Sequence, residues 1–130
     1  MAQSALIDSS VYIGLLRAGR DPGESIHARY EETDVVTCGI VRLEVLRGVK
    51  AERMKSWMEG VFSIMQCVPT DNQLWDDATE LAWELDRAGK TIPATDLMIA
   101  ACALRGDALV HTYDRHFLLV PGLAVATDLL

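Results

Sequence analysis

Short apolar segments alternate with longer segments of helical periodicity from one end of the chain to the other. The β-branched and aliphatic runs that predict strands cover residues 5–7, 34–38, 63–68 and 108–112, with a fifth candidate at 123–126. The segments that predict helices cover residues 11–17, 24–30, 40–47, 51–62, 70–88 and 94–105. Because helices separate the strands, we expect an α/β fold: a central, mostly parallel sheet of four to five strands, flanked by helices on both faces.

The composition indicates a single folded domain over residues 1–130. Half of the 130 residues are hydrophobic and 24% are charged, which excludes an intrinsically disordered chain. Lys and Arg number 12 against 19 Asp and Glu, and the net charge is −7. This balance argues against nucleic-acid binding through a broadly basic surface. It is compatible with a nuclease whose acidic residues surround metal ions.

We expect a cytoplasmic protein that does not enter a membrane. No uncharged stretch approaches the roughly 20 residues that cross a bilayer. The residues before Asp8 lack the basic segment that starts a signal peptide. The cysteines, Cys38, Cys67 and Cys102, are odd in number and far apart, and we interpret them as reduced thiols in the core.

Four carboxylates from distant parts of the sequence map to one edge of the predicted sheet. Asp8 directly follows the first strand, and Asp114 lies two residues beyond the fourth. Asp96 lies in the first turn of the helix that leads into the fourth strand, and Glu44 lies in the helix after the second strand. Sites in open parallel sheets form at the carboxyl ends of the strands, so we expect these side chains to converge there.

Three of these carboxylates also have a purely structural interpretation. Asp8 and Asp114 could cap helices, although Ser9 and Ser10 already offer caps beside Asp8. Asp96 suits the positive end of its helix. The convergence nevertheless favours a metal site, because four clustered negative charges repel one another strongly without a counter-ion. Hard divalent cations such as Mg²⁺ and Mn²⁺ prefer oxygen ligands of this kind.

Glu44 is the hardest of the four to explain structurally. Its neighbours in sequence are mostly apolar, so we expect it to lie in a mostly buried helix. A lone carboxylate there is costly unless it is paired or binds a metal. A salt bridge to Arg42 or Arg47 is the alternative.

The four carboxylates lie in four short motifs. These motifs read LIDSSVYI at 6–13, IVRLEVLRG at 40–48, IPATDLMIAA at 92–101 and TYDRHF at 112–117. With these motifs, in this order and spacing, the sequence resembles the PIN-domain ribonucleases, and most closely the VapC-type toxins of bacterial toxin–antitoxin pairs. The resemblance extends from about residue 6 to residue 125, and between residues 48 and 89 it is limited to the pattern of helices and strand.

The resemblance implies a PIN-like fold and an Mg²⁺-dependent endoribonuclease, with Mn²⁺ as an alternative ion. The acidic set that it implies, for catalysis and for the metal, is Asp8, Glu44, Asp96 and Asp114. Thr112 and Ser10 are the polar residues expected to support this set. Similar toxins dimerise and are neutralised by a small antitoxin. The implied partners are therefore an RNA substrate, a cognate antitoxin and a second copy of the chain.

Our hypothesis for the chemistry is that Asp8, Asp96 and Asp114 hold the main ion. Glu44 then completes the set, directly or through a water molecule that it orients. One or two divalent ions would activate the attacking water, offset charge on the phosphate and stabilise the leaving oxygen.

Two other functions compete with this hypothesis. In a haloacid-dehalogenase-like phosphatase Asp8 would be a nucleophile, but that motif requires a second acid at the position of Ser10 and a lysine in the phosphate site. The nearest candidate, Lys90, lies in a predicted turn. The other alternative is a non-catalytic PIN-fold module that binds RNA or serves as a scaffold, which would not need the acidic set.

The remaining candidates receive structural interpretations. We interpret His111 and His116 as turn histidines without chemistry, since no Ser or Cys nucleophile accompanies them. Contact of His116 with phosphate is the alternative. The arginines near the motifs are expected to be solvated or ion-paired, with some contacting RNA phosphates: Arg17, Arg42, Arg47 and Arg115. Most large apolar residues between 57 and 83 are expected in the core, and the rest in a subunit or antitoxin interface; they include Trp57, Met58, Phe62, Leu74, Trp75 and Trp83.

Overall fold

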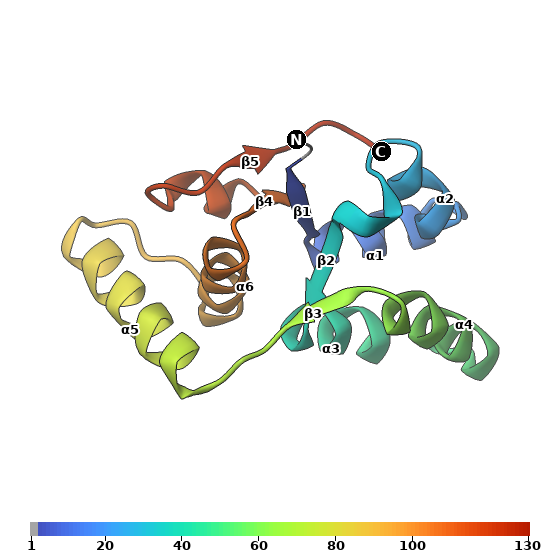
Figure 1. Ribbon diagram of the computed structural model, residues 1–130, viewed down its shortest axis with the longest axis horizontal. Coiled ribbons are helices and arrows are strands. Elements are labelled where there is room, and N and C mark those ends of the chain that lie inside the picture. The colour runs from blue at the N-terminus through green and yellow to red at the C-terminus, as the bar shows by residue number, and fades with distance from the viewer. Residues whose placement is uncertain (1–2) are drawn as a thin grey trace.

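The fold is built on a sheet of five parallel strands. The computed structural model describes residues 3–130. Strands β1 (Ser4–Ile7), β2 (Val35–Cys38), β3 (Gln66–Val68), β4 (Ala108–His111) and β5 (Val125–Ala126) lie in the order β3-β2-β1-β4-β5 (Figure 1). The first strand of the sequence is therefore the central strand of the sheet. The predicted α/β fold is confirmed, with all five candidate strands in the sheet.

Six α-helices surround the sheet. They are α1 (Ser9–Arg17), α2 (Pro22–His27), α3 (Gly39–Arg47), α4 (Glu52–Ser63), α5 (Asn72–Arg87) and α6 (Ala94–Arg105), and the short 3-10 helices are η1 (Glu32–Asp34) and η2 (Arg115–Leu119). Helix α5 packs against α6 on one side of the central strands, whereas α1 and α2 lie on the other side (Figure 1). Within residues 3–130, no helix is long and apolar enough to cross a membrane.

Most element boundaries lie within two or three residues of the predicted ones. The helix predicted at 24–30 and the third strand differ most. Helix α2 begins at Pro22 and ends at His27. The third strand is expected at 63–68, but α4 continues to Ser63 and only Gln66–Val68 pairs with β2. Helix α1 begins at Ser9 rather than at residue 11, because Asp8 caps it. These differences do not move any of the four carboxylates away from the carboxyl edge of the sheet.

The core includes a buried aromatic contact between α1 and α4. Tyr12 and Phe62 are both fully buried, and their ring centroids lie 5.1 Å apart in an edge-to-face arrangement. Met58 and Leu74 are fully buried as well, as the sequence predicts. This packing fixes α1, and with it the residues that follow β1.

The prediction that most large apolar side chains between 57 and 83 are buried is wrong for three tryptophans. Trp57, Trp75 and Trp83 keep 40%, 52% and 56% of their surface exposed. The cause is that α4 and α5 each bury one narrow stripe, which in α5 contains Leu74 and Leu85. Trp57 and Trp75 are each one position away from a buried residue, which turns them by about 100° toward the surface, and Trp83 lies two positions before Leu85.

One cysteine also departs from expectation. Cys38 and Cys102 are buried free thiols, but Cys67 is exposed. Cys67 lies on β3, which is an edge strand of the sheet and in which only Val68 is buried.

Candidate active site

The site forms where two neighbouring parallel strands end. Ile7 of β1 is paired with His111 of β4, so that Asp8 and Thr112 leave the sheet side by side. The backbone amide of Asp8 donates a hydrogen bond to the carbonyl oxygen of His111 at 2.9 Å. The pairing of β1 with β4 therefore brings together two motifs that are far apart in the sequence.

Asp8 is buried and uses only one carboxylate oxygen for hydrogen bonds. Its Oδ2 accepts from the Ser10 hydroxyl at 2.6 Å, from the Thr112 hydroxyl at 2.9 Å and from the Ser10 backbone amide at 3.4 Å. The last bond makes Asp8 the N-cap of α1, which is the structural alternative noted above. Its Oδ1 is buried without a hydrogen-bond partner. Capping thus leaves one oxygen of this carboxylate free.

The hydroxyls of Ser10 and Thr112 connect Asp8 to the last motif. Ser10 Oγ accepts from the Tyr113 backbone amide at 3.1 Å, and Thr112 Oγ1 accepts from the Asp114 backbone amide at 2.9 Å. The two hydroxyl oxygens are 3.3 Å apart. Both residues predicted to support the acidic set therefore contact Asp8 and the segment that carries Asp114.

Asp96, Asp114 and His116 lie together at the same edge. Asp96 is on the first turn of α6 and is nearly buried, and Asp114 precedes η2 and accepts from the His116 backbone amide at 2.9 Å. His116 Nδ1 lies 3.1 Å from Asp96 Oδ2 and 3.1 Å from Asp114 Oδ1. One potential ligand atom from each of the three residues lies within 4.8 Å of the others.

The interpretation of His116 as an isolated turn histidine missed this contact. The spacing Asp114-x-His116 contains a local indication, since an aspartate that accepts from the amide two residues later turns the chain back over its own carboxylate. The contact with Asp96 depends on how α6 and η2 pack, which the sequence pattern does not give.

Glu44 is linked to the cluster through a serine. Its Oε1 accepts a hydrogen bond from the Ser9 hydroxyl at 3.0 Å, and Ser9 is adjacent to Asp8 in the chain. The expectation of a mostly buried helix is wrong, because Val41 and Val45 are the buried residues of α3 and Glu44 is half-buried. Within the described chain it forms no ion pair with either of the neighbouring arginines that the sequence offered.

Two groups of the site, Asp96 and His116, have raised pKa values. The pKa of Asp96 is raised to about 6, mainly by burial. The hydrogen bond from His116 lowers this pKa, whereas the charges of Asp114 and Asp8 raise it. The hydrogen bond to Asp96 and the charge of Asp114 raise the pKa of His116. Such shifts are typical of a site in which negative charge is concentrated.

These shifts predict how the metal-free protein depends on pH. Because the pKa of Asp96 is higher in the folded chain, the folded state binds more protons than the unfolded state between about pH 4 and pH 6. The free energy of unfolding therefore falls as the pH rises through this window, and the raised pKa of His116 extends the fall to higher pH. We expect Asp96→Asn to stabilise the protein more at pH 7.5 than at pH 4.5, measured by thermal unfolding in EDTA. An equal effect at both pH values would contradict the assignment.

Thr112 offers a second test of the network. Replacing it with valine removes the donor to Asp8 Oδ2 and leaves the half-buried Asp114 amide without its acceptor. We expect Thr112→Val to lower the free energy of unfolding by about 1–3 kcal/mol. We expect it to weaken Mn²⁺ binding by about tenfold or more in calorimetric titrations. Thr112→Ser keeps the hydroxyl and is the matched control; it should retain most of the Mn²⁺ affinity, and a loss equal to that of valine would disprove the role of the hydroxyl.

His111, unlike His116, lies in a buried hydrogen-bond network away from the four carboxylates. It is the last residue of β4 rather than part of a turn, and it is fully buried. Its Nδ1 lies 2.6 Å from the Tyr30 hydroxyl, and its Nε2 lies 2.7 Å from the carbonyl oxygen of Asp128. Both ring nitrogens are therefore occupied away from the carboxylates.

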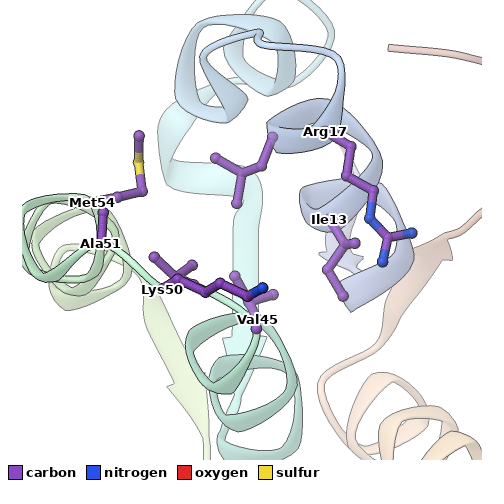
Figure 2. Close-up of a pocket in the computed structure, with 9 residues that line it drawn as sticks. Ile13, Arg17, Val45, Lys50, Ala51 and Met54 are labelled. Atoms are coloured by element: carbon purple, nitrogen blue, oxygen red, sulfur yellow. The ribbon is translucent and has the colours of Figure 1, made fainter.

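An apolar groove lies between α1 and the connection from α3 to α4. It has a volume of about 380 Å³, and its walls include Ile13 of α1, Val45 of α3 and Met54 of α4 (Figure 2). Arg17 and Lys50, both exposed, add positive charge to its lining. None of the four carboxylates lines this groove.

Comparison with known proteins finds one family and several solved structures that are similar to this chain. The PIN domain family matches residues 5–123. No curated protein sequence matches the chain. Among solved structures, a DNA-bound VapBC complex from Salmonella typhimurium matches with a TM-score of 0.79 and 23% identity over 95% of this chain and 97% of the other. VapBC2 from Rickettsia felis, bound to a promoter DNA fragment, matches with a TM-score of 0.78 and 19% identity over 95% and 98%. A toxin–antitoxin complex from Klebsiella pneumoniae matches with a TM-score of 0.74 and 21% identity over 95% and 97%.

Proposed function

Because this chain belongs to the PIN-domain family, we propose that it is a divalent-metal-dependent endoribonuclease of the VapC type, the toxin of a toxin–antitoxin pair. The observation that carries the proposal is the buried Oδ1 of Asp8, which has no hydrogen-bond partner, at the edge where Asp96 and Asp114 also lie. Burial of a carboxylate oxygen without a partner is costly, and a bound cation would offset that cost.

The residues present fit a hard divalent cation. Asp8, Asp96 and Asp114 would hold it with carboxylate oxygens, which Mg²⁺ and Mn²⁺ prefer. Glu44 keeps one carboxylate oxygen on Ser9, and its other oxygen is available to orient a water molecule. When bound, the cation would supply a more acidic water and offset charge on the phosphate.

The chain's own residues have separate tasks in this proposal. Ser10 and Thr112 fix the orientation of Asp8, so that Oδ1 stays directed away from the hydroxyl network. The arginines near the motifs are available for RNA phosphates, because within residues 3–130 they form no ion pairs. They are Arg17, Arg42, Arg47 and Arg115, of which all but Arg42 are exposed. Phosphate contacts would position RNA over an otherwise acidic site.

The groove supports an antitoxin as partner. Its apolar walls and the charges of Arg17 and Lys50 suit an amphipathic segment that carries acidic residues. Several of the matched structures are VapBC or toxin–antitoxin complexes. For a second copy of the chain, the exposed tryptophans Trp75 and Trp83 on α5 offer apolar surface.

The proposal is tested by incubating purified protein with total cellular RNA in Mg²⁺, in Mn²⁺ and in EDTA. We expect discrete cleavage products with either cation and none in EDTA, and mapping the ends of the products identifies the target. A folded protein that binds neither cation in titrations and cleaves nothing would favour the non-catalytic RNA-binding or scaffold module.

A further inference from the structure

One side chain at the site has no place in an all-carboxylate metal centre. His116 Nδ1 lies 3.1 Å from a carboxylate oxygen of Asp96 and 3.1 Å from one of Asp114. Ligand atoms that lie next to each other around an octahedral ion are separated by about 3 Å, since each is about 2.1 Å from the ion. His116 Nδ1 thus already has the spacing of a neighbouring ligand from each of the two carboxylate oxygens, and all three atoms lie within 4.8 Å of one another. The unpartnered Asp8 Oδ1 belongs to the residue that follows β1 at the same edge of the sheet.

We propose that His116 is itself a metal ligand, so that this chain holds its cation with a nitrogen as well as with carboxylate oxygens. The inference rests on the proposed function, because it concerns the same centre. It differs from the hypothesis drawn from the sequence, in which only acidic residues bind the ion.

The contacts of its own backbone amide and of the next residue fix the position of His116. Its backbone amide donates to Asp114 Oδ1 at 2.9 Å, which ties the residue to one of its proposed co-ligands. The next residue, Phe117, is fully buried and anchors η2 in the core. The imidazole itself remains 47% exposed, so a cation can reach it from solvent.

The other described histidines cannot supply this nitrogen. His111 uses both ring nitrogens on Tyr30 and Asp128. His27 is exposed on α2, outside the group of potential ligands. A nitrogen signal from a bound metal would therefore identify His116.

A nitrogen ligand changes which ions the site prefers. Mg²⁺ is a hard cation that takes oxygen ligands and keeps several waters, whereas imidazole is a ligand of transition metals. We therefore expect the site to bind Mn²⁺ more tightly than Mg²⁺, and we expect this preference to depend on His116.

The test uses Mn²⁺ as a paramagnetic probe of the full chain. Electron spin-echo spectra of the Mn²⁺-bound protein should contain the ¹⁴N modulation of a coordinated imidazole. In His116→Asn, which places an amide oxygen near the position of Nδ1, this modulation should disappear. Mn²⁺ affinity should fall by about tenfold or more. Mg²⁺ affinity should change much less, so that the preference for Mn²⁺ is reduced. His27→Asn is the matched control and should retain both the modulation and the affinity, and thermal unfolding checks that each variant is folded.

The outcomes separate the two proposals. If wild-type protein binds Mn²⁺ but shows no coordinated nitrogen, His116 is not a ligand, whereas the metal-dependent function stands. Persistence of the modulation in His116→Asn would also overturn the assignment. If wild-type protein binds no Mn²⁺, both proposals fail together.

Discussion

Asp8→Asn is expected to abolish metal-dependent RNA cleavage while leaving the protein folded. Asparagine keeps the shape of the side chain and an oxygen that can accept from Thr112 and cap α1. It removes the negative charge that the proposed cation requires. Loss of a direct ligand should reduce the cleavage rate by more than the roughly 10–100-fold that follows loss of a residue behind a ligand. The rate is measured with Mn²⁺ on a mapped RNA target.

The same variant should not be less stable without metal. Removing one of several clustered negative charges relieves repulsion, so in EDTA the melting temperature should stay the same or rise. Asp21→Asn is the matched control, because Asp21 also caps a helix, α2, with its side chain but lies outside the acidic cluster. That control should cleave at the wild-type rate. Undiminished cleavage by Asp8→Asn would disprove the proposed role of Asp8.

Phe62→Ala is expected to have the largest effect on stability. Phe62 is fully buried and packs edge-to-face on Tyr12, which joins α4 to α1. Truncation of a buried phenylalanine removes its transfer free energy and leaves a cavity, at a cost of about 3–5 kcal/mol. Since domains of this kind are stable by roughly 5–15 kcal/mol, the variant should unfold at markedly lower urea concentration.

Ile64→Ala is the comparison for this prediction. Ile64 lies two residues further on, at the end of α4, and keeps 64% of its surface exposed. Its truncation should change the free energy of unfolding by about 0.5 kcal/mol or less. Equal losses for the two variants would mean that the contact between α4 and α1 does not contribute to the core as described.

The sequence was sufficient to predict the fold and the edge at which the carboxylates gather. Alternating strands and helices require crossover connections, and these require a parallel sheet whose sites lie at one edge. Asp8 directly follows β1 and Asp114 lies three residues after the end of β4, so their placement needed only the pairing of β1 with β4. The resemblance to the PIN-domain family is confirmed by the family match over residues 5–123.

Features that depend on the packing of one element against another could not be predicted. The contact of His116 with Asp96 requires the relative positions of η2 and α6. The link from Glu44 to Ser9 requires the packing of α3 on α1, and it replaces the buried environment that apolar neighbours suggested. The exposure of Trp75 follows from the narrow buried stripe of α5. In each case a local pattern was consistent with more than one three-dimensional arrangement.

The central pairing of β1 with β4 also bears on when the protein acquires its site during synthesis. Asp8 and Thr112 are 104 residues apart, and β4, which directly precedes Thr112, is synthesised after all six α-helices described above. A nascent chain that has been made only as far as α6 contains Asp8, Glu44 and Asp96 but lacks the segment that aligns them. Contacts of such high separation also form late in folding. The site can therefore be complete only after β4 and the segment that carries Asp114 have been made.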